Sequence, residues 1–180
     1  VVAEAFETGG HNGREEATTM VLVPAVKQAV SLPLMAAGGI ASGAAMVAAM
    51  ALGADGIQAG SLFAVAEESS AHPDFKRLVT SLKEGDTQLA LKKLAPVRLI
   101  KNTFFREVAE AEARGASAEE LSSLLGKGRA KKGIFEGDLE QGELEIGQVS
   151  SMLHAIEPVS VIMDRLMREA EETRARLTSS

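Results

Sequence analysis

The sequence predicts an α/β protein in which parallel β/α units occupy residues 1–66 and a helical extension occupies residues 67–180. Three observations lead to this prediction: short apolar segments alternate with helix-like ones, each apolar segment ends in glycine, and the chain becomes charged and amphipathic from residue 67. A repeated strand, glycine loop and helix is typical of parallel β/α units. Because the strands are apolar along both faces, we expect helices or a barrel interior to cover both sides.

The first part is expected to contain three strands and two helices. The strands cover residues 1–5, 32–39 and 56–63, and the helices cover residues 19–30 and 42–54. Valines at helical spacing indicate the first helix, and Pro24 is tolerable there if it lies in the first turn. The second helix has Ser42 placed as its N-cap and Gly53 as its C-cap.

The second part is expected to be helical over residues 73–84, 87–113, 117–132 and 142–177. Ser117, with Glu120 three residues later, forms the pattern of a capping box. His72 precedes a proline and is expected to start a helix. His154 is expected on an amphipathic helix with a surface or packing role. The acidic, glycine-rich stretch before Gly147 is expected to be a loop that leads into a helix.

Composition and charge exclude several classes of protein. Hydrophobic residues make up 46% of the chain, which argues against disorder. A net charge of −6, with no stretch that combines Lys, Arg and aromatics, argues against a nucleic-acid surface. The absence of cysteine excludes disulfides and thiolate chemistry, and three isolated histidines make no metal cluster.

The apolar runs and the first residues of the chain indicate where in the cell the protein is expected. No apolar run is long enough to span a bilayer, and the first residues lack the features of a signal peptide. We therefore expect a cytoplasmic protein with no membrane partner. The chain starts with Val, within an expected strand, which suggests a piece of a longer protein.

Glycines at the ends of the expected strands indicate a ligand site. Ligands of parallel β/α folds bind on the loops that follow the carboxyl ends of the strands. Gly38-Gly39 and Gly60-Ser61 end two consecutive strands, and backbone N–H groups exposed there, with the Ser61 hydroxyl, favour an anion. These loops predict a phosphate site for a mononucleotide or a phosphorylated small molecule; the alternative is that the glycines only make tight turns.

Two ionisable residues after the first strand are candidates for a role in the site. His11 follows Gly9 and Gly10, and an imidazole there serves either as an acid or base or in a local hydrogen bond. Glu4 interrupts the apolar strand, and a structural hydrogen bond and a ligand contact are equally compatible with it. Farther along, Arg98 and Lys101 fall on one face of the expected helix, where they either contact an acidic partner or are simply solvated.

Several motifs, in order, resemble the flavin-dependent nitronate monooxygenase family, which also contains enoyl-acyl-carrier-protein reductase II. These motifs are "AEAFETGGHNG…TTMVLVPAV", "LPLMAAGGIASG…ALGADGIQAGSLF" and "AHPDFK…RLIKN". The resemblance covers nearly the whole chain. The segment "GDLEQGELEIGQVSSML" is more similar to the enoyl reductase branch. The family often has glycine where Ala5 stands.

The resemblance implies part of a TIM barrel, namely its C-terminal strands, with a helical C-terminal extension. It implies that Gly38, Gly39, Gly60 and Ser61 bind the FMN phosphate, with Gln58 at the adjacent strand end. It further implies that His11 sits beside the flavin ring, as the base that deprotonates a nitroalkane or as a group that positions substrate or reduced nicotinamide. Gly9 and Gly10 would then leave room for flavin and substrate.

Two enzyme activities follow from the resemblance. The first is reduction of an enoyl thioester on an acyl carrier protein, with NADH or NADPH as the reductant and with Arg98 and Lys101 as a basic patch for the carrier. The second is oxidation of nitroalkanes or nitronates with O2. A monovalent cation matters in some of these reductases, but no residue identifies its site here, and a homodimer is compatible with the sequence.

Two readings without redox chemistry compete with these. One is a phosphate-binding β/α protein, and the other is a helical interaction module built on residues 70–180. The first half of the family's barrel is missing from the chain, so residues 1–180 alone are expected to expose sheet edges, bind FMN poorly and aggregate.

Overall fold

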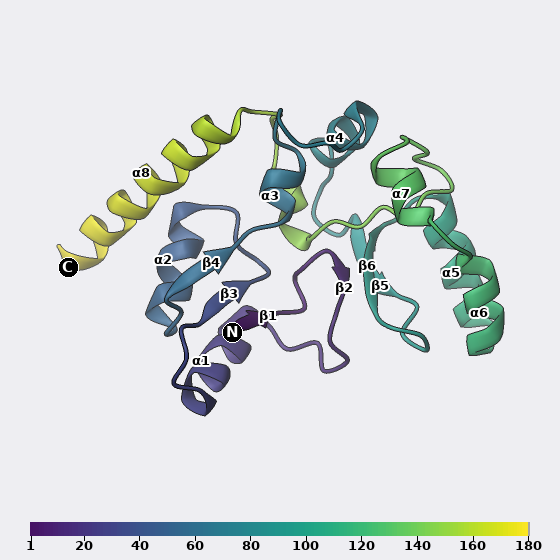
Figure 1. Ribbon diagram of the computed structural model, residues 1–180, viewed down its shortest axis with the longest axis horizontal. Coiled ribbons are helices and arrows are strands. Elements are labelled where there is room, and N and C mark those ends of the chain that lie inside the picture. Colours follow the sequence, from purple (N-terminus) through teal and green to yellow (C-terminus); the bar gives the residue numbers. More distant parts are fainter. Residues whose placement is uncertain (180) are drawn as a thin grey trace.

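The computed structural model describes residues 1–179 and contains two three-stranded sheets that lie next to each other (Figure 1). The first sheet is parallel, with the strand order β1-β3-β4. Its strands are β1 (Val2–Glu4), β3 (Met35–Ala37) and β4 (Gly56–Gln58). These strands lie within the three predicted ranges, and their parallel pairing confirms the β/α units expected for residues 1–66.

Helices α1 (Thr19–Ala29) and α2 (Gly43–Ala51) follow β1 and β3, as predicted. They enclose a core of small and branched side chains with the strands: Ala3, Val23, Leu34, Ala36, Ile40, Ala49 and Ala54. Ser42 caps α2, because its hydroxyl accepts a hydrogen bond from the Ala45 N–H. Pro24 lies in the interior of α1 rather than in its first turn, so that part of the prediction is wrong.

The second sheet is antiparallel, with the order β2-β6-β5, and it was not predicted. It consists of β2 (Gly10–His11), β5 (Thr87–Ala90) and β6 (Val97–Ile100), and α5 (Thr103–Ala113) follows it. The helix predicted over residues 87–113 is therefore wrong in its first half. Pro96 cannot continue a helix, and the chain turns at Leu91, whose φ is 57°, to form a hairpin instead.

The remaining helices are α3 (Ser61–Ala64), α4 (Pro73–Val79), α6 (Ala118–Leu125), α7 (Arg129–Ile134), the 3₁₀ helix η1 (Gln148–Met152) and α8 (Val159–Thr178). The capping box of Ser117 and Glu120 is present on α6, and His72 caps α4, which confirms both predictions. The helix predicted over residues 117–132 is interrupted between α6 and α7, where Gly126 and Gly128 have positive φ.

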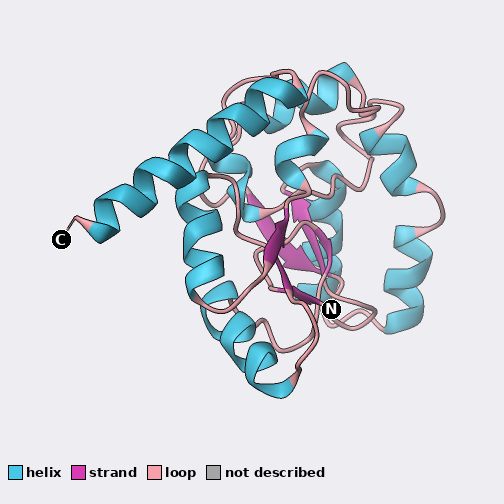
Figure 2. Ribbon diagram, turned by 60° about the vertical axis from the view of Figure 1, so that its left-hand side comes forward, coloured by secondary structure: helices cyan, strands magenta, loops and turns pink. Residues whose placement is uncertain are grey.

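The helix predicted over residues 142–177 begins only at Val159, after Pro158. Before it the chain runs extended past β6 and forms η1, and His154 lies in the irregular segment between η1 and α8, not on a helix. Figure 2 shows the strands at the centre with helices around them and α8 reaching away from the body. Helix α8 packs on α2, and the Glu169 carboxylate accepts a hydrogen bond from the Gly43 N–H at 2.8 Å.

The fold prediction is confirmed in part. The chain is α/β, but its second part contains strands as well as helices, and neither sheet closes into a barrel within residues 1–179. No helix of that described part is both long and apolar enough to cross a membrane.

Candidate functional site

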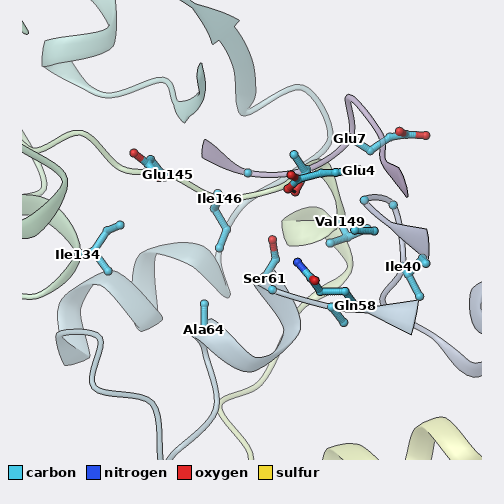
Figure 3. A pocket seen from close by; sticks show the side chains of 17 residues that line it. Glu4, Glu7, Ile40, Gln58, Ser61, Ala64, Ile134, Glu145, Ile146 and Val149 are labelled. Carbon is cyan, nitrogen blue, oxygen red and sulfur yellow. Dashed lines mark hydrogen bonds between the residues drawn. The ribbon is translucent and has the colours of Figure 1, made fainter. Parts of the chain in front are cut away.

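A cavity of about 310 Å³ opens at the carboxyl ends of the three parallel strands (Figure 3). Residues that follow each strand line it: Glu7–Gly9 after β1, Ala37–Ile40 at the end of β3, and Gln58–Ser61 at the end of β4. Ile134, Glu145, Ile146 and Val149 close the side that faces the second sheet. The three glycine-ended segments thus meet at one place, as their positions in the sequence predict.

Gly38 and Gly39 are required by the course of the backbone. Their φ values are +94° and +72°, and a Cβ on Gly38 would stand 2.9 Å from the Ala5 carbonyl oxygen. The Thr19 hydroxyl donates a hydrogen bond to the Gly38 oxygen at 2.9 Å. These glycines make the tight turn that brings the loop after β3 to the cavity, and both line it.

Gly60 and Ser61 stand in a more open place. A Cβ on Gly60 would meet no atom within 4 Å, and the φ of Gly60, −85°, is one that any residue can adopt. Neither packing nor backbone conformation within the chain therefore requires glycine at this position. The Ser61 hydroxyl accepts a hydrogen bond from the Gly147 N–H at 2.9 Å, which leaves its own proton to donate. The Gln58 amide also lines the cavity. This side of the cavity offers neutral donors and free space.

Glycine is needed at positions 9 and 10 for a different reason from the one predicted. A Cβ on Gly9 would overlap the backbone of Ile146 and Gly147, and one on Gly10 would stand 2.6 Å from Oε2 of Glu145. The space beside both glycines is therefore filled by segment 145–147 of the same chain. Gly9 lines the cavity, whereas Gly10 is not among the residues that do.

His11 is exposed and lies in β2, opposite Val97 of β6. It is not among the residues that line the cavity. The Asn12 amide holds the loop before it, since its nitrogen donates to the carbonyl oxygens of Thr8 and Gly10, at 3.2 and 2.9 Å. His11 is thus fixed by a backbone pairing rather than carried on a free loop.

Three carboxylates line the cavity, and two of them have hydrogen-bond partners. Glu7 accepts from the backbone N–H of Thr19 at 3.2 Å, at the start of α1. Glu4 accepts from the Thr8 hydroxyl at 3.0 Å, so the structural alternative predicted for Glu4 is present, and Glu4 also lines the cavity. Within residues 1–179, the side chain of Glu145 accepts no hydrogen bond, and its burial raises its pKa, while the charge of His11 opposes that shift.

Arg98 corrects the prediction of a basic surface patch. Its side chain is 2% exposed, lies 5.1 Å from the centre of the Phe6 ring, and donates from Nε and Nη2 to the Phe6 carbonyl oxygen. Burial lowers the pKa of the guanidinium. Arg98 therefore holds the loop after β1 onto β6 and cannot meet a partner. Lys101 is exposed but follows a strand, so the two share no helical face.

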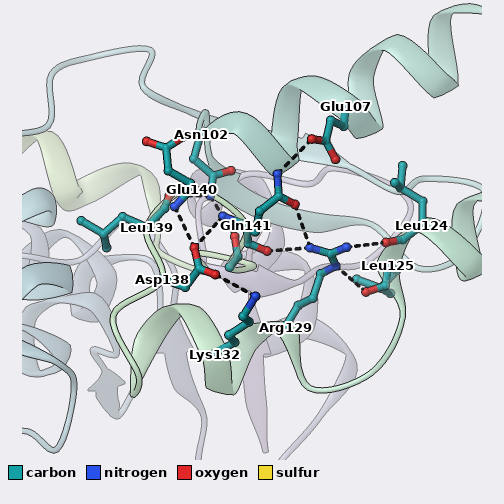
Figure 4. A network of polar contacts seen from close by, with 11 residues as sticks. Asn102, Glu107, Leu124, Leu125, Arg129, Lys132, Asp138, Leu139, Glu140 and Gln141 are labelled. Carbon is teal, nitrogen blue, oxygen red and sulfur yellow. Dashed lines mark hydrogen bonds and ion pairs between the residues drawn. The ribbon is translucent and has the colours of Figure 1, made fainter.

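A polar network holds the loop that precedes Glu145 in place, and so positions Glu145 at the cavity (Figure 4). The Arg129 guanidinium donates to the carbonyl oxygens of Leu124, Leu125 and Gln141 at 2.7–3.0 Å and lies 4.4 Å from the centre of the Phe104 ring. The Asn102 amide donates to two further carbonyls of the same loop, those of Leu139 and Gly142. The loop that precedes Glu145 is thus held by half-buried side chains that donate several hydrogen bonds each.

Known proteins resemble this chain in sequence and in fold. The sequence profile of the family described as nitronate monooxygenase matches residues 1–169. The chain is 32% identical over 177 residues to a probable nitronate monooxygenase of Bacillus subtilis, covering 94% of this chain and 51% of that protein. A probable nitronate monooxygenase of Staphylococcus saprophyticus is 34% identical over 146 residues, covering 74% of this chain and 41% of that protein.

Two solved structures have a similar fold. FabK from Thermotoga maritima superposes with a TM-score of 0.92 at 37% identity, over 99% of this chain and 56% of that one. Nitroalkane oxidase from Streptomyces ansochromogenes has a TM-score of 0.78 at 32% identity, over 98% of this chain and 53% of that one. The chain thus spans about half the length of the proteins that it matches.

Proposed function

This chain belongs to the nitronate monooxygenase family, and on that premise we propose that it forms the phosphate-binding part of an FMN-dependent oxidoreductase. One observation carries the proposal. The loops after β3 and β4 meet at one cavity, which Gly38, Gly39, Gly60 and Ser61 all line.

The residues present fit a phosphate bound by neutral donors. Beside Gly60 there is open space of the kind a ligand would fill, and the Ser61 hydroxyl keeps a proton to donate. Helix α2 takes no part in this site, because its Gly43 N–H is bound to Glu169 and a Cβ on Gly43 would overlap α8. Backbone N–H groups and hydroxyls are the donors that phosphates find in glycine-rich loops.

The residues of this chain have three tasks in the proposed reaction. Gly60 and Ser61 hold the phosphate end of the cofactor, and Gly38 and Gly39 shape the loop beside it. Bound FMN supplies the transfer of a hydride or of electrons, which no side chain of this composition provides. Ile40, Ile146 and Val149 are apolar parts of the cavity wall.

For the complete protein, the first candidate activity is reduction of an enoyl thioester by NADH or NADPH. It is supported by the likeness to FabK, an enoyl-acyl-carrier-protein reductase II, in fold and identity over nearly the whole chain. Since Arg98 is buried, a surface for an acyl carrier protein would have to be built from other cations, such as Lys101.

The second candidate activity is oxidation of nitronates or nitroalkanes with O2. The names of the curated relatives and the likeness to nitroalkane oxidase favour it. In that reaction His11, which does not itself line the cavity, would be the final acceptor of the proton that leaves the carbon next to the nitro group.

A visible absorption spectrum of the complete protein tests the cofactor, and two assays test the activity. Flavin bands with NADH oxidation that depends on an enoyl thioester support the first candidate. Oxygen uptake with a nitronate and no NADH supports the second. A colourless protein that still binds phosphate compounds would contradict both and favour a β/α protein without redox activity.

Matched glycine variants locate the phosphate. Neither a Cβ on Gly60 nor one on Gly13 would meet an atom within 4 Å, and neither residue has a positive φ, but only Gly60 lines the cavity. We expect Gly60→Ala to weaken FMN binding by about tenfold, which corresponds to one displaced contact of about 1.4 kcal/mol. Gly13→Ala should leave the affinity unchanged, and equal effects of the two variants would contradict the assignment.

A further inference from the structure

The strand register places Glu145 beside His11. On β6, Val97 lies opposite His11, and Leu99, two residues later, lies opposite Glu145 in an isolated antiparallel bridge. The hydrogen bonds from the Asn12 N–H to Pro96 and from the Ile100 N–H to Leu144 show that both segments pair with the same edge of β6.

This pairing brings the two side chains to one face of the sheet. Residues directly opposite each other in an antiparallel pair share a face, and residues two apart on one strand share it too. His11 and Glu145 therefore stand on the same face, about 7 Å apart along the edge, given a rise of about 3.4 Å per residue. Gly10 lies between them and has no side chain, and Oε2 of Glu145 occupies the space where its Cβ would stand.

Glu145 differs from the other carboxylates of the cavity. Glu4 and Glu7 accept hydrogen bonds, whereas Glu145 accepts none within residues 1–179 and still lines the cavity. Its side chain is shown at the border between the cavity and the second sheet in Figure 3. Its carboxyl group is thus the one free to contact a ligand.

The charged groups around Glu145 are few. His11 faces it from β2, and Glu143 precedes it on the same segment. Burial raises the pKa of Glu143 and the charge of Glu145 raises it further, while His11 and Arg129 of α7 oppose the shift. Arg98 of β6 is bound to Phe6 and does not neutralise this pair of carboxyls.

We propose that Glu145 is a further acid–base residue of this site, which faces the ligand in the cavity and exchanges protons with the exposed His11 by way of solvent at the edge of β6. The proposal rests on the proposed function. Reduction of an enoyl thioester breaks the C=C π bond and adds a hydride, which comes from the reduced nicotinamide, to one carbon and a proton to the other. Glu145 gives that proton, and His11 restores it from solvent. In nitroalkane oxidation the proton moves in the opposite direction, from the substrate carbon to Glu145 and then by way of His11 to solvent.

The test compares variants of the complete protein loaded with FMN. Glu145→Gln keeps the shape of the side chain but cannot exchange a proton, and we expect kcat to fall about 100-fold, the usual contribution of general acid–base catalysis. FMN affinity should stay unchanged, and the limb of the pH–rate profile that Glu145 causes should disappear. Glu145→Asp should restore part of the rate. The matched control is Glu15→Gln, an exposed carboxylate near His11 in sequence, which should have wild-type kinetics.

A double-mutant cycle separates a working pair from two independent residues. If the pair acts as a unit, Glu145→Gln should have almost no further effect on kcat in a His11→Ala background. Additive losses, or a Glu145→Gln variant with wild-type kcat and pH profile, would overturn the proposal while leaving the flavin function intact. If the wild-type protein binds no flavin, it is the proposed function that fails.

Discussion

The parallel and antiparallel sheets of this chain bury their surfaces differently. The core of the parallel unit consists of alanines and a few branched residues, and large apolar side chains around it remain exposed: Val1, Val2, Met20, Val21, Leu32, Met35 and Met50. The core around β5, β6, α5 and α6 has ten buried residues, which include two phenylalanines and five leucines or valines, each of these five at most 2% exposed. Between residues 67 and 150 only Phe135 is a large exposed hydrophobic residue.

This difference indicates which region depends on further protein. The antiparallel region has covered its own apolar surface, whereas the parallel unit has not, and β1 stands at an edge of its sheet with unpaired backbone groups. The matched proteins are about twice as long as the aligned part. The parallel unit is therefore the region where we expect the rest of a longer protein to pack.

The largest expected effect comes from isolating the chain. Expressed alone, residues 1–180 should self-associate through the parallel unit and retain little FMN, because its edges and apolar side chains are uncovered. Light scattering after gel filtration, with flavin absorbance, measures both. A monomeric, yellow preparation would show that the parallel unit is complete without further chain.

Large-to-small core substitutions test how much each region contributes to the free energy of unfolding. Phe104 is fully buried there, and Phe104→Ala should lower the free energy of unfolding by about 3–5 kcal/mol. Val23→Ala in the parallel core removes fewer atoms and should cost about 2 kcal/mol. Urea denaturation of the complete protein gives both values. If Val23→Ala lowered the free energy of unfolding more than Phe104→Ala, the parallel core would be the better packed of the two, contrary to this comparison.

Arg98 connects the two regions, because it lies on β6 and donates hydrogen bonds to the loop after β1. Its replacement tests whether stability and FMN binding depend on this connection. Arg98→Met leaves the Phe6 carbonyl oxygen without its donor, so we expect a loss of about 2 kcal/mol and weaker FMN binding. Lys101→Ala, three residues later and exposed, should change stability by less than about 0.5 kcal/mol. Thermal unfolding followed by flavin fluorescence distinguishes them, and similar effects of the two variants would count against this connection.

The smallest expected effect is local. Ser117→Ala removes the capping box of α6, which should cost about 1 kcal/mol of stability and leave the flavin spectrum unchanged. A shift of a few degrees in the thermal midpoint, with an unaltered spectrum, is the expected result. A changed spectrum would show that α6 communicates with the cavity.

The features that the sequence predicted correctly are those with local causes. Ser42, His72 and Ser117 bind backbone N–H groups two or three residues away, and Gly38-Gly39 turn the chain where they stand. Such signals are contained in a few neighbouring residues. For this reason the parallel unit, the N-cap of α2 and the meeting of the three loops could all be predicted, whereas the C-cap of α2 is Leu52 and not Gly53.

The features that were missed depend on distant partners. Nothing next to Arg98 in the sequence reveals that its guanidinium binds Phe6, and the only local warning against a helix there was Pro96. Glu145 looked like one acid among many in a glycine-rich stretch, and its place in the cavity follows from the pairing with Leu99. The spacing of glutamates at 143 and 145 is the one local sign of an extended segment.

The hydrogen bond between Ser61 and Gly147 has a consequence for the order of folding. It joins residues 86 positions apart, and the bond from Gly43 to Glu169 spans 126 positions. Contacts of such long range form late, because the intervening chain must first be ordered. During synthesis the glycine loops leave the ribosome long before the segment that seals their cavity, so this cavity should be among the last parts of the molecule to take shape.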